Sequence, residues 1–427
     1  ANNDNTTVTI NDGYIESTAG TAIYQPQKGT MTIHGGRIVG AGTGIEVRSG
    51  DVNITNGYIA GMNDILDTRD YNNGPTVYGA AIAVSQHTTQ HDINISGGTF
   101  DGIYAIYEAD HTDGKLNSND GYKDNVNISI TDGTFNGSIY SQHCDDFITG
   151  GTFSHPTALD YLGKNANVAI NLTEDYDRKN DINQSGFTIG ATQNVTMDLG
   201  EYRFSAPSLA VDKGGALLVN LPDGGGVAPE SDKAFLALGR SLDLNDIGKL
   251  RVGTVSSSSA AAAFGADSTL VVDGKAASDQ AMITGSGELS VADGAQLYIA
   301  NAEANTDYII TEGLTSGEGE YWTEANLLAN RLIKATISRD GDAVVVETEV
   351  KDVASALPGV IPVSGLTGML AQNLNNTDSS SMGIRFLSRA VEPLYMGDDA
   401  KAVATINEVS RAAVTAGVQN TALRLAD

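Results

Sequence analysis

Apolar and polar residues alternate in a short phrase that returns several times in the first part of the chain. The phrase reads "VTINDGYI", "MTIHGGRI", "VNITNGYI", "INISGGTF" and "ISITDGTF", with a looser copy in "DFITGGTF". Before each glycine every second residue is aliphatic, which is typical of a β-strand with one buried face. The glycines predict turns that need a positive φ or a missing Cβ. They are Gly13, Gly36, Gly57, Gly98, Gly133 and Gly151.

A second strand follows each turn, with an isoleucine that comes after Ala, Gly or Ser in "TAIYQ", "TGIEV", "AAIAV", "YAIYE" and "GSIYS". These isoleucines are Ile23, Ile45, Ile82, Ile106 and Ile139. Self-similarity at a short period indicates a solenoid, in which each repeat stacks on the next. We therefore expect an all-β fold, a right-handed single-stranded parallel β-helix, over residues 1–165. A β-sandwich of short strands is the alternative, but a sandwich has no need to repeat its turn sequence.

The pattern weakens after residue 165 and changes again after residue 300. Residues 166–300 keep short alternating strands between Gly, Asp and Asn, which predicts degenerate coils of the same solenoid. Within them the low-complexity run "SSSSAAAAFG" predicts a loop or a weak coil. In residues 301–355 an Asp-Gly turn joins "KATIS" to "AVVVETEV", which predicts a β-hairpin that caps the solenoid end. Residues 356–427 are rich in helix formers and predict an α-helical linker.

The chain is strongly acidic. Its 427 residues carry 53 Asp and Glu against 25 Lys and Arg, a net charge of −28. Such a surface repels phosphate backbones and anionic headgroups, so we expect no nucleic-acid binding and no direct membrane insertion of this part. No apolar run approaches the ~20 residues that a membrane-spanning helix needs. The single cysteine, Cys144, excludes an intramolecular disulfide framework.

The C-terminal part resembles a known family. Residues 354–427, notably "ALPGV", "NLNNTDSSSMGIRFLSRA" and "AKAVATINEVSRAAVTAG", look like the segment that joins the passenger of a bacterial autotransporter to its translocator barrel. The resemblance implies type V secretion through the periplasm and outer membrane to the cell surface or the extracellular medium. It also implies a partner, the chain's own C-terminal outer-membrane β-barrel, which the 427 residues do not include. Residues 301–355 are similar in placement to the family's autochaperone region.

Histidines recur at matching places in consecutive repeats. Each of them follows a second-strand isoleucine by four or five residues and stands beside Gln or Asp. The predicted group consists of His87, His111, His143, Gln86, Asp110 and Gln142. Stacked imidazoles with a carboxylate suit a metal ion, but no tight ligand spacing supports one, and the residues also fit exposed loop corners. We therefore expect no metal and no cofactor, and we keep the group as a candidate ligand-contacting edge.

Two polar insertions interrupt the repeat, at residues 61–78 and 108–125. They are rich in Asp and carry Tyr71, Tyr78 and Tyr122. Long loops on a rigid scaffold often carry binding residues, and tyrosine rings are suitable platforms for sugars. The alternative interpretation is that these loops are solvent-exposed and bind no ligand.

Catalytic motifs are weak in this sequence. "GADSTL" at 265–270 lacks the glycine that should follow the serine of a serine-protease turn, and the adjacent Asp145 and Asp146 would face opposite ways in a strand. We therefore expect a non-enzymatic passenger that acts in adhesion or self-association, with a host glycan, a surface protein or a second copy as partner. The alternative is a surface polysaccharide-degrading enzyme, a lyase or hydrolase, that uses a cleft beside the 108–125 insertion with Asp110 and His111.

Overall fold

The computed structural model describes most of the chain up to Val350. The described residues are 6–350 except 69–73, 86–88, 113–114, 117–123, 222–231, 257, 276–279, 301, 317–320 and 330–332, together with Ala404 and Asn407. This part is nearly all β, as predicted, with three-residue and six-residue 3-10 helices between strands. Of the predicted helical linker only Ala404 and Asn407 are described, both as helical, and the rest lies outside the described residues.

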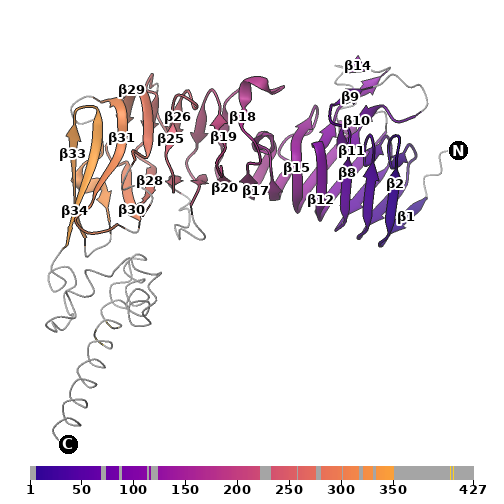
Figure 1. Ribbon diagram of the computed structural model, residues 1–427, viewed down its shortest axis with the longest axis horizontal. Helices are drawn as coiled ribbons and strands as arrows, with labels where there is room; N and C mark the ends of the chain where they lie inside the picture. Colours follow the sequence, from indigo (N-terminus) through magenta and orange to yellow (C-terminus); the bar gives the residue numbers. More distant parts are fainter. Residues whose placement is uncertain are drawn as a thin grey trace, which may run out of the picture. The chain divides into compact units, whose positions relative to one another are not determined.

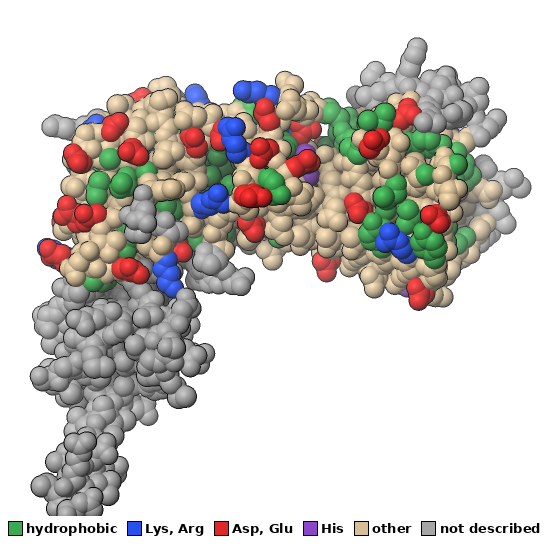
Figure 2. Space-filling view, viewed as in Figure 1, with side chains coloured by type: hydrophobic (Ala, Val, Ile, Leu, Met, Phe, Trp, Pro, Cys, Tyr) green, Lys and Arg blue, Asp and Glu red, His purple; other side chains and the backbone are tan. Residues whose placement is uncertain are grey.

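The chain forms two compact units. Unit 1 consists of residues 1–220, 228–235 and 246–248, and unit 2 consists of residues 221–227, 236–245 and 249–427. One of the points at which the chain passes from unit 1 to unit 2 falls within β24 (Ala234–Leu238). Figure 2 shows acidic side chains spread over the visible face, rather than gathered in one patch.

The first strands of consecutive repeats in unit 1 lie side by side in parallel (Figure 1). Successive partners are Ile10, Ile33, Ile54, Ile95 and Ile130, so one aliphatic ladder lines the interior. The strands are β1 (Thr7–Ile10), β4 (Thr30–Ile33), β7 (Asp51–Ile54), and the first parts of β12 (His91–Glu108) and β15 (Val126–Ser141).

A second stack follows the glycine turns. All of the predicted turn glycines have a positive φ, from 90° at Gly36 to 128° at Gly133, which confirms their interpretation as turns. The stack comprises β2 (Tyr14–Ser17), β5 (Arg37–Gly40), β8 (Tyr58–Gly61), the middle of β12 and β15, β16 (Ile148–Phe153), β17 (Leu162–Asn171), β20 (Asn194–Asp198) and β23 (Ala216–Val219). Its interior includes stacked rings of Phe100, Phe135 and Phe153, whose centroids are 4.7 and 4.8 Å apart.

A third stack carries the predicted isoleucine ladder. Ile23, Ile45, Ile82, Ile106 and Ile139 are successive register partners, which confirms the prediction made from the second-strand phrase. The strands are β3 (Ile23–Gln25), β6 (Ile45–Val47), β11 (Ala80–Val84) and the last parts of β12 and β15. Parallel strands lie about 4.8 Å apart, so like side chains stack at van der Waals distance.

Unit 1 also contains short strands and 3-10 helices between the stacked strands. The first insertion contains the antiparallel pair β9 (Asp67–Thr68) and β10 (Val77–Tyr78), and the second contains β13 (His111–Thr112) and β14 (Lys115–Leu116). Further along the chain are η2 (Pro156–Tyr161), β18 (Tyr176–Asp177), η3 (Arg178–Asn180), β19 (Phe187–Ile189), β21 (Phe204–Ser205) and β22 (Leu209–Val211). Of these, β18 pairs in parallel with β21, and β19 with β22.

Unit 2 continues with short parallel strands and ends in an antiparallel hairpin. The parallel strands are β25 (Leu242–Asp243), β26 (Leu250–Val252), β27 (Ala262–Phe264), β28 (Ser268–Asp273), β29 (Ile283–Val291), β30 (Gln296–Ala300), β31 (Asp307–Thr315) and, after η4 (Glu324–Asn326), β32 (Leu327–Leu328). The end of the low-complexity run therefore forms a strand, β27. The predicted hairpin is confirmed, because β33 (Ile333–Asp340) pairs with β34 (Ala343–Val350) across Gly341.

Candidate functional site

The predicted site residues are only partly described. Gln86, His87, Tyr71 and Tyr122 lie outside the described residues, so their assignment stays a prediction. His111 lies in β13, where its backbone pairs with Leu116, and its side chain also lies outside the described part.

Asp110 and Gln142 come together at the end of the third stack. The Asp110 backbone N–H donates to Gln142 Oε1 at 2.9 Å, and His143 follows Gln142 directly. Asp110 is 1% exposed, so its own side chain does not stand at an exposed loop corner. Tyr78 is placed elsewhere, since its ring lies against Gly20 and Gly42, where a Cβ would approach within 3.3 Å or less.

Glu108 organises this edge, and the sequence analysis missed it. This fully buried carboxylate accepts from the Ser141 hydroxyl, from the His143 backbone N–H at 2.9 Å, and lies 3.3 Å from His143 Nδ1. Ser141 Oγ in turn accepts from the Cys144 backbone N–H at 2.8 Å. The carboxylate therefore fixes the turn that leaves β15. The repeat pattern of the sequence could have revealed this contact, because Glu108 and Ser141 occupy matching positions of consecutive repeats and are register partners.

The arrangement around Glu108 does not activate a nucleophile. In a catalytic triad the imidazole stands between the hydroxyl and the carboxylate. Here Ser141 and His143 both bond the same carboxylate. Burial and the nearby Glu108 raise the pKa of the Cys144 thiol to about 12, so it stays protonated at neutral pH. These contacts are suited to holding the turn in place.

A second buried carboxylate, Glu46, accepts hydrogen bonds from the C-terminal end of the first insertion. Its two oxygens accept from the Thr76 backbone N–H and hydroxyl at 2.9 Å and from the Ser85 hydroxyl at 2.7 Å. Val77 adds a backbone N–H at 3.3 Å. Desolvation by burial raises the pKa of Glu46, and these hydrogen bonds oppose the shift.

Arg48 adds a second attachment to the same segment. Its Nη1 donates to Tyr24 Oη and to the Gly74 carbonyl, each at 2.9 Å. Glu46 in β6 and Arg48, which directly follows this strand, thus anchor residues 74–77 together. The insertion is built on a fixed base, which is the arrangement expected of a loop that presents residues to a partner.

Three tyrosines lie between the bases of the two insertions. The ring of Tyr107 contacts Tyr104 edge-on at 5.2 Å and stacks on Tyr140 at 5.3 Å. Tyr107 is buried against Val77 and its neighbours, while Tyr104 and Tyr140 are half-buried. Burial raises the pKa of all three phenols, so they stay neutral. The cluster offers aromatic surface. In the sequence it could have been found from the tyrosines that directly follow Ile106 and Ile139.

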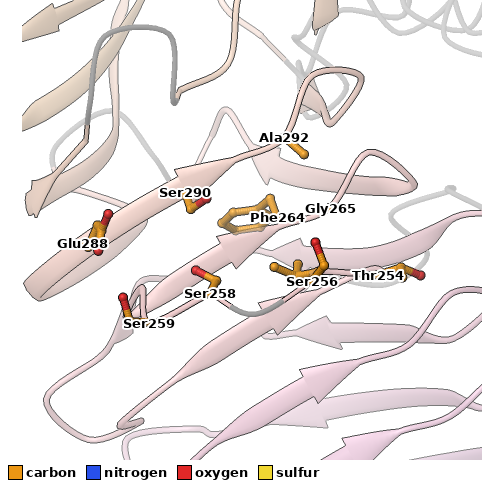
Figure 3. Close-up of a pocket in the computed structure, with 10 residues that line it drawn as sticks. Thr254, Ser256, Ser258, Ser259, Phe264, Gly265, Glu288, Ser290 and Ala292 are labelled. Carbon is orange, nitrogen blue, oxygen red and sulfur yellow. The ribbon is translucent and has the colours of Figure 1, made fainter.

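Unit 2 contains a pocket lined mainly by hydroxyl groups (Figure 3). Its volume is about 340 Å³, and its lining includes Thr254, Ser256, Ser258, Ser259, Ser290 and Glu288. Phe264 lies among them, but it is 1% exposed and packs on Trp322. The lining can exchange hydrogen bonds with a small polar molecule, and its only charged group is acidic.

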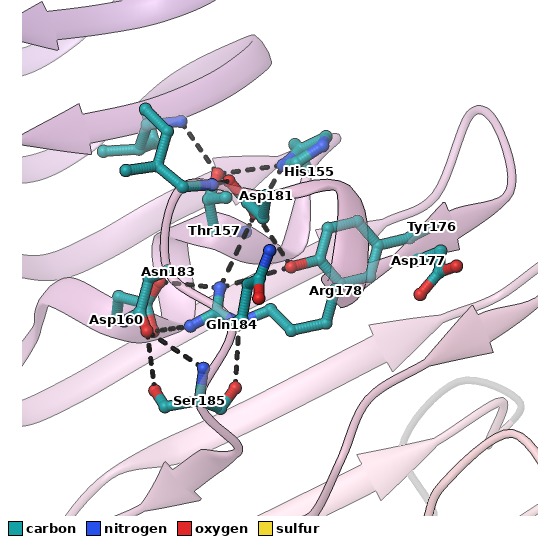
Figure 4. Close-up of polar contacts among 12 residues, drawn as sticks. His155, Thr157, Asp160, Tyr176, Asp177, Arg178, Asp181, Asn183, Gln184 and Ser185 are labelled. Carbon is teal, nitrogen blue, oxygen red and sulfur yellow. Dashed lines mark hydrogen bonds and ion pairs between the residues drawn. The ribbon is translucent and has the colours of Figure 1, made fainter.

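A closed polar network surrounds Arg178 in unit 1 (Figure 4). Its guanidinium donates to both oxygens of Asp160, at 2.8 and 2.6 Å, and to the Ser185 carbonyl at 3.0 Å. Tyr176 Oη donates to Asp181 at 3.0 Å, and Arg178 lies over the Phe187 ring. Arg178 is fully buried, so the network ties the 176–186 loop to η2.

In the part that the structure describes, no group of three or more His, Cys, Asp or Glu side chains is arranged to hold a metal ion. Among the same residues no helix is both long enough and apolar enough to cross a bilayer. Comparisons with protein-family models, curated proteins and solved structures found no match to this chain.

Proposed function

We propose that the chain is a passenger of the autotransporter type, folded as a right-handed parallel β-helix, that acts in adhesion or self-association at the bacterial cell surface. The observation that carries this proposal is the parallel register of consecutive repeats in unit 1. It assembles outward rows from residues that are far apart in the sequence. One such row consists of Thr9, Thr32, Asn53, Asn94 and Ser129.

The order of strand pairing supports the β-helix. In each of the first repeats the chain visits the first, second and third stack in turn, and every partner strand is parallel. A chain that returns to three parallel stacks in a constant order has to wind in one direction. Crossovers between parallel strands are right-handed in nearly all proteins, which supports the right-handed coil.

The outward rows are suited to recognition because they are rigid. In the row that contains Asn53, the Asn94 side-chain amide donates to Asn53 Oδ1 at 3.0 Å. Side chains that are already held in place lose little conformational entropy when a partner binds. The buried carboxylates of Glu46 and Glu108 hold segments next to the two insertions, and the insertions can add specific contacts.

Export to the surface is supported by the sequence. The resemblance of residues 354–427 to an autotransporter linker supplies the route, and a chain with one cysteine forms no internal disulfide that could obstruct it. The net charge of −28 favours solubility and disfavours polyanionic partners. A glycan, a surface protein or a second copy of the chain remains as the proposed partner.

The test compares bacteria that display the chain with bacteria that display a shuffled version. Residues 69–73 and 113–123 are shuffled, which leaves the Glu46 contacts with Thr76 in place. The readouts are the settling rate of the cells and their retention on surfaces coated with glycans, matrix proteins or the purified chain. We expect faster settling or higher retention with the native chain.

Equal settling and equal retention would contradict the proposal. New reducing ends or unsaturated products from a polysaccharide, lost on Asp110→Asn, would instead support the polysaccharide-degrading enzyme. The shuffled version should be produced at the same surface level, measured with an antibody against an epitope tag, so that a display defect is not mistaken for lost adhesion.

A further inference from the structure

An outward row of the second stack combines aromatic and planar polar side chains. Tyr14, Arg37 and Tyr58 are successive register partners in β2, β5 and β8. Each stands next to an inward-facing isoleucine in its own strand, so the three side chains share the outer surface. Tyr14 is 59% exposed and Arg37 is exposed, while Tyr58 is half-buried.

Asp101 lies next to this row. In β12, the next strand of the stack, Thr99 is the register partner of Tyr58, and Asp101 Oδ2 accepts from Tyr58 Oη at 2.8 Å. The Arg37 guanidinium lies over the Tyr58 ring, 4.0 Å from its centre. Both contacts hold Tyr58 in one orientation before any ligand arrives, which reduces the entropy lost on binding.

The chemistry of the row fits a sugar chain. A pyranose ring has an apolar face of C–H groups that packs on an aromatic ring, and a rim of hydroxyl groups. Arg37 supplies several parallel donors and Asp101 supplies two acceptor oxygens, which suits adjacent hydroxyl groups on one sugar. The row advances by about 4.8 Å per strand, a step comparable to one sugar unit, so successive sugars can meet successive strands.

The acidic surroundings of the row favour a neutral glycan over an anionic one. Glu16 is exposed in the same strand as Tyr14, and the whole chain carries a net charge of −28. Figure 2 shows hydrophobic side chains gathered around a basic one over the strands near the N-terminal end of unit 1, with acidic side chains beside them. A uronate or sialate polymer would meet this acidic field at every unit, whereas a neutral chain would not.

We propose that Tyr14, Arg37, Tyr58 and Asp101 form a binding site for a neutral linear glycan that lies across the strands. This inference rests on the proposed adhesive function and names the partner class of one face. The site is distinct from the tyrosine cluster and the insertions, which belong to the third stack and its loops.

The test is titration of the full chain with neutral linear oligosaccharides, namely glucan, mannan and N-acetylglucosamine oligomers, and with a uronate oligomer of matched length. We expect saturable binding of at least one neutral oligomer. Tyr14→Ala and Tyr58→Ala should each weaken it by about fivefold, because one aromatic contact is worth roughly 1 kcal/mol. Thr188→Ala, at an exposed position of β19, is the matched control and should leave the affinity unchanged.

The outcomes separate this inference from the proposed function. Absence of binding to every neutral oligomer, unchanged affinity in Tyr14→Ala, or tighter binding of the uronate oligomer would overturn the glycan site. If displayed cells still settle or adhere in those cases, the adhesive function stands without it. Because Tyr14 is exposed, Tyr14→Ala should keep the far-ultraviolet circular dichroism of the native chain, which excludes misfolding as the cause of a loss.

Discussion

At the scale of single residues, the structure depends on a few buried charged groups. Glu46 accepts hydrogen bonds from Thr76, Val77 and Ser85, and these bonds join a regular strand to an insertion. The sequence could not predict them, because Thr76 is 30 residues away and belongs to a segment without a counterpart in other repeats. Glu108 could have been found from the repeat register, because its partner Ser141 occupies the matching position of the next repeat.

Glu46 should make stability depend on pH. Because burial raises its folded-state pKa above the ordinary value of 4.5, its contribution is present below that value and is lost as pH rises through the folded-state pKa. In Glu46→Gln this part of the pH dependence should disappear. At neutral pH the variant should lose about 1–3 kcal/mol, since its amide group faces donors of Thr76 and Ser85.

The measurement for this prediction is urea unfolding of both proteins between pH 4.5 and 8. Glu16→Gln, on an exposed position, is the control and should stay within about 0.5 kcal/mol of the native chain. An identical slope of unfolding free energy against pH in the native chain and Glu46→Gln would show that Glu46 does not titrate differently in the folded state.

Arg178 should be required for the stability of unit 1. Arg178→Met leaves Asp160 without its bidentate partner, and breaking a buried ion pair costs about 3–5 kcal/mol. The matched control is Lys179→Met, at the exposed next position of η3. Replacing both partners, as in Arg178→Met with Asp160→Leu, should recover part of the loss, and denaturant midpoints measure all three. A loss of the same size in Lys179→Met would refute this account.

At the scale of elements, the interior ladders were the most predictable feature. The isoleucine ladder of the third stack could be predicted because one alternating phrase recurs, and the phrase sets both the buried face and the register. The turn glycines were predictable for the same reason. The role of β27 was not, because a run of Ser and Ala has no alternation that would identify its buried face.

The phenylalanine stack offers a direct test of ladder energetics. Phe135 lies between Phe100 and Phe153 and is fully buried, so Phe135→Ala should cost about 3–5 kcal/mol of unfolding free energy. Phe135→Leu should cost less, because more of the volume stays filled. The neighbouring Thr134 is exposed, and Thr134→Ala should have little effect. Equal midpoints for Phe135→Ala and Thr134→Ala in chemical denaturation would contradict the stacked core.

At the scale of the whole molecule, the proposed function depends on how repeats assemble one surface. Both the proposed adhesion and the proposed glycan site need residues from separate repeats to be neighbours, as Asn53 and Asn94 are across 41 residues of sequence. The candidate site was only partly predictable on this scale. Its residues Asp110 and Gln142 are next to each other, but the tyrosine–arginine row of the second stack becomes visible only once the register is known.

The central claim is therefore the parallel register, and disulfide cross-linking tests it most directly. In a Cys144→Ala background, Asn53→Cys with Asn94→Cys places two thiols on adjacent strands, within the Cα separation that a disulfide requires. Thr32→Cys with Asn94→Cys spans two strand spacings, roughly 10 Å, which is too far. Under mild oxidation of the folded chain, the first pair should cross-link rapidly and the second should not. Equal cross-linking of both pairs, or none in the first, would contradict the account.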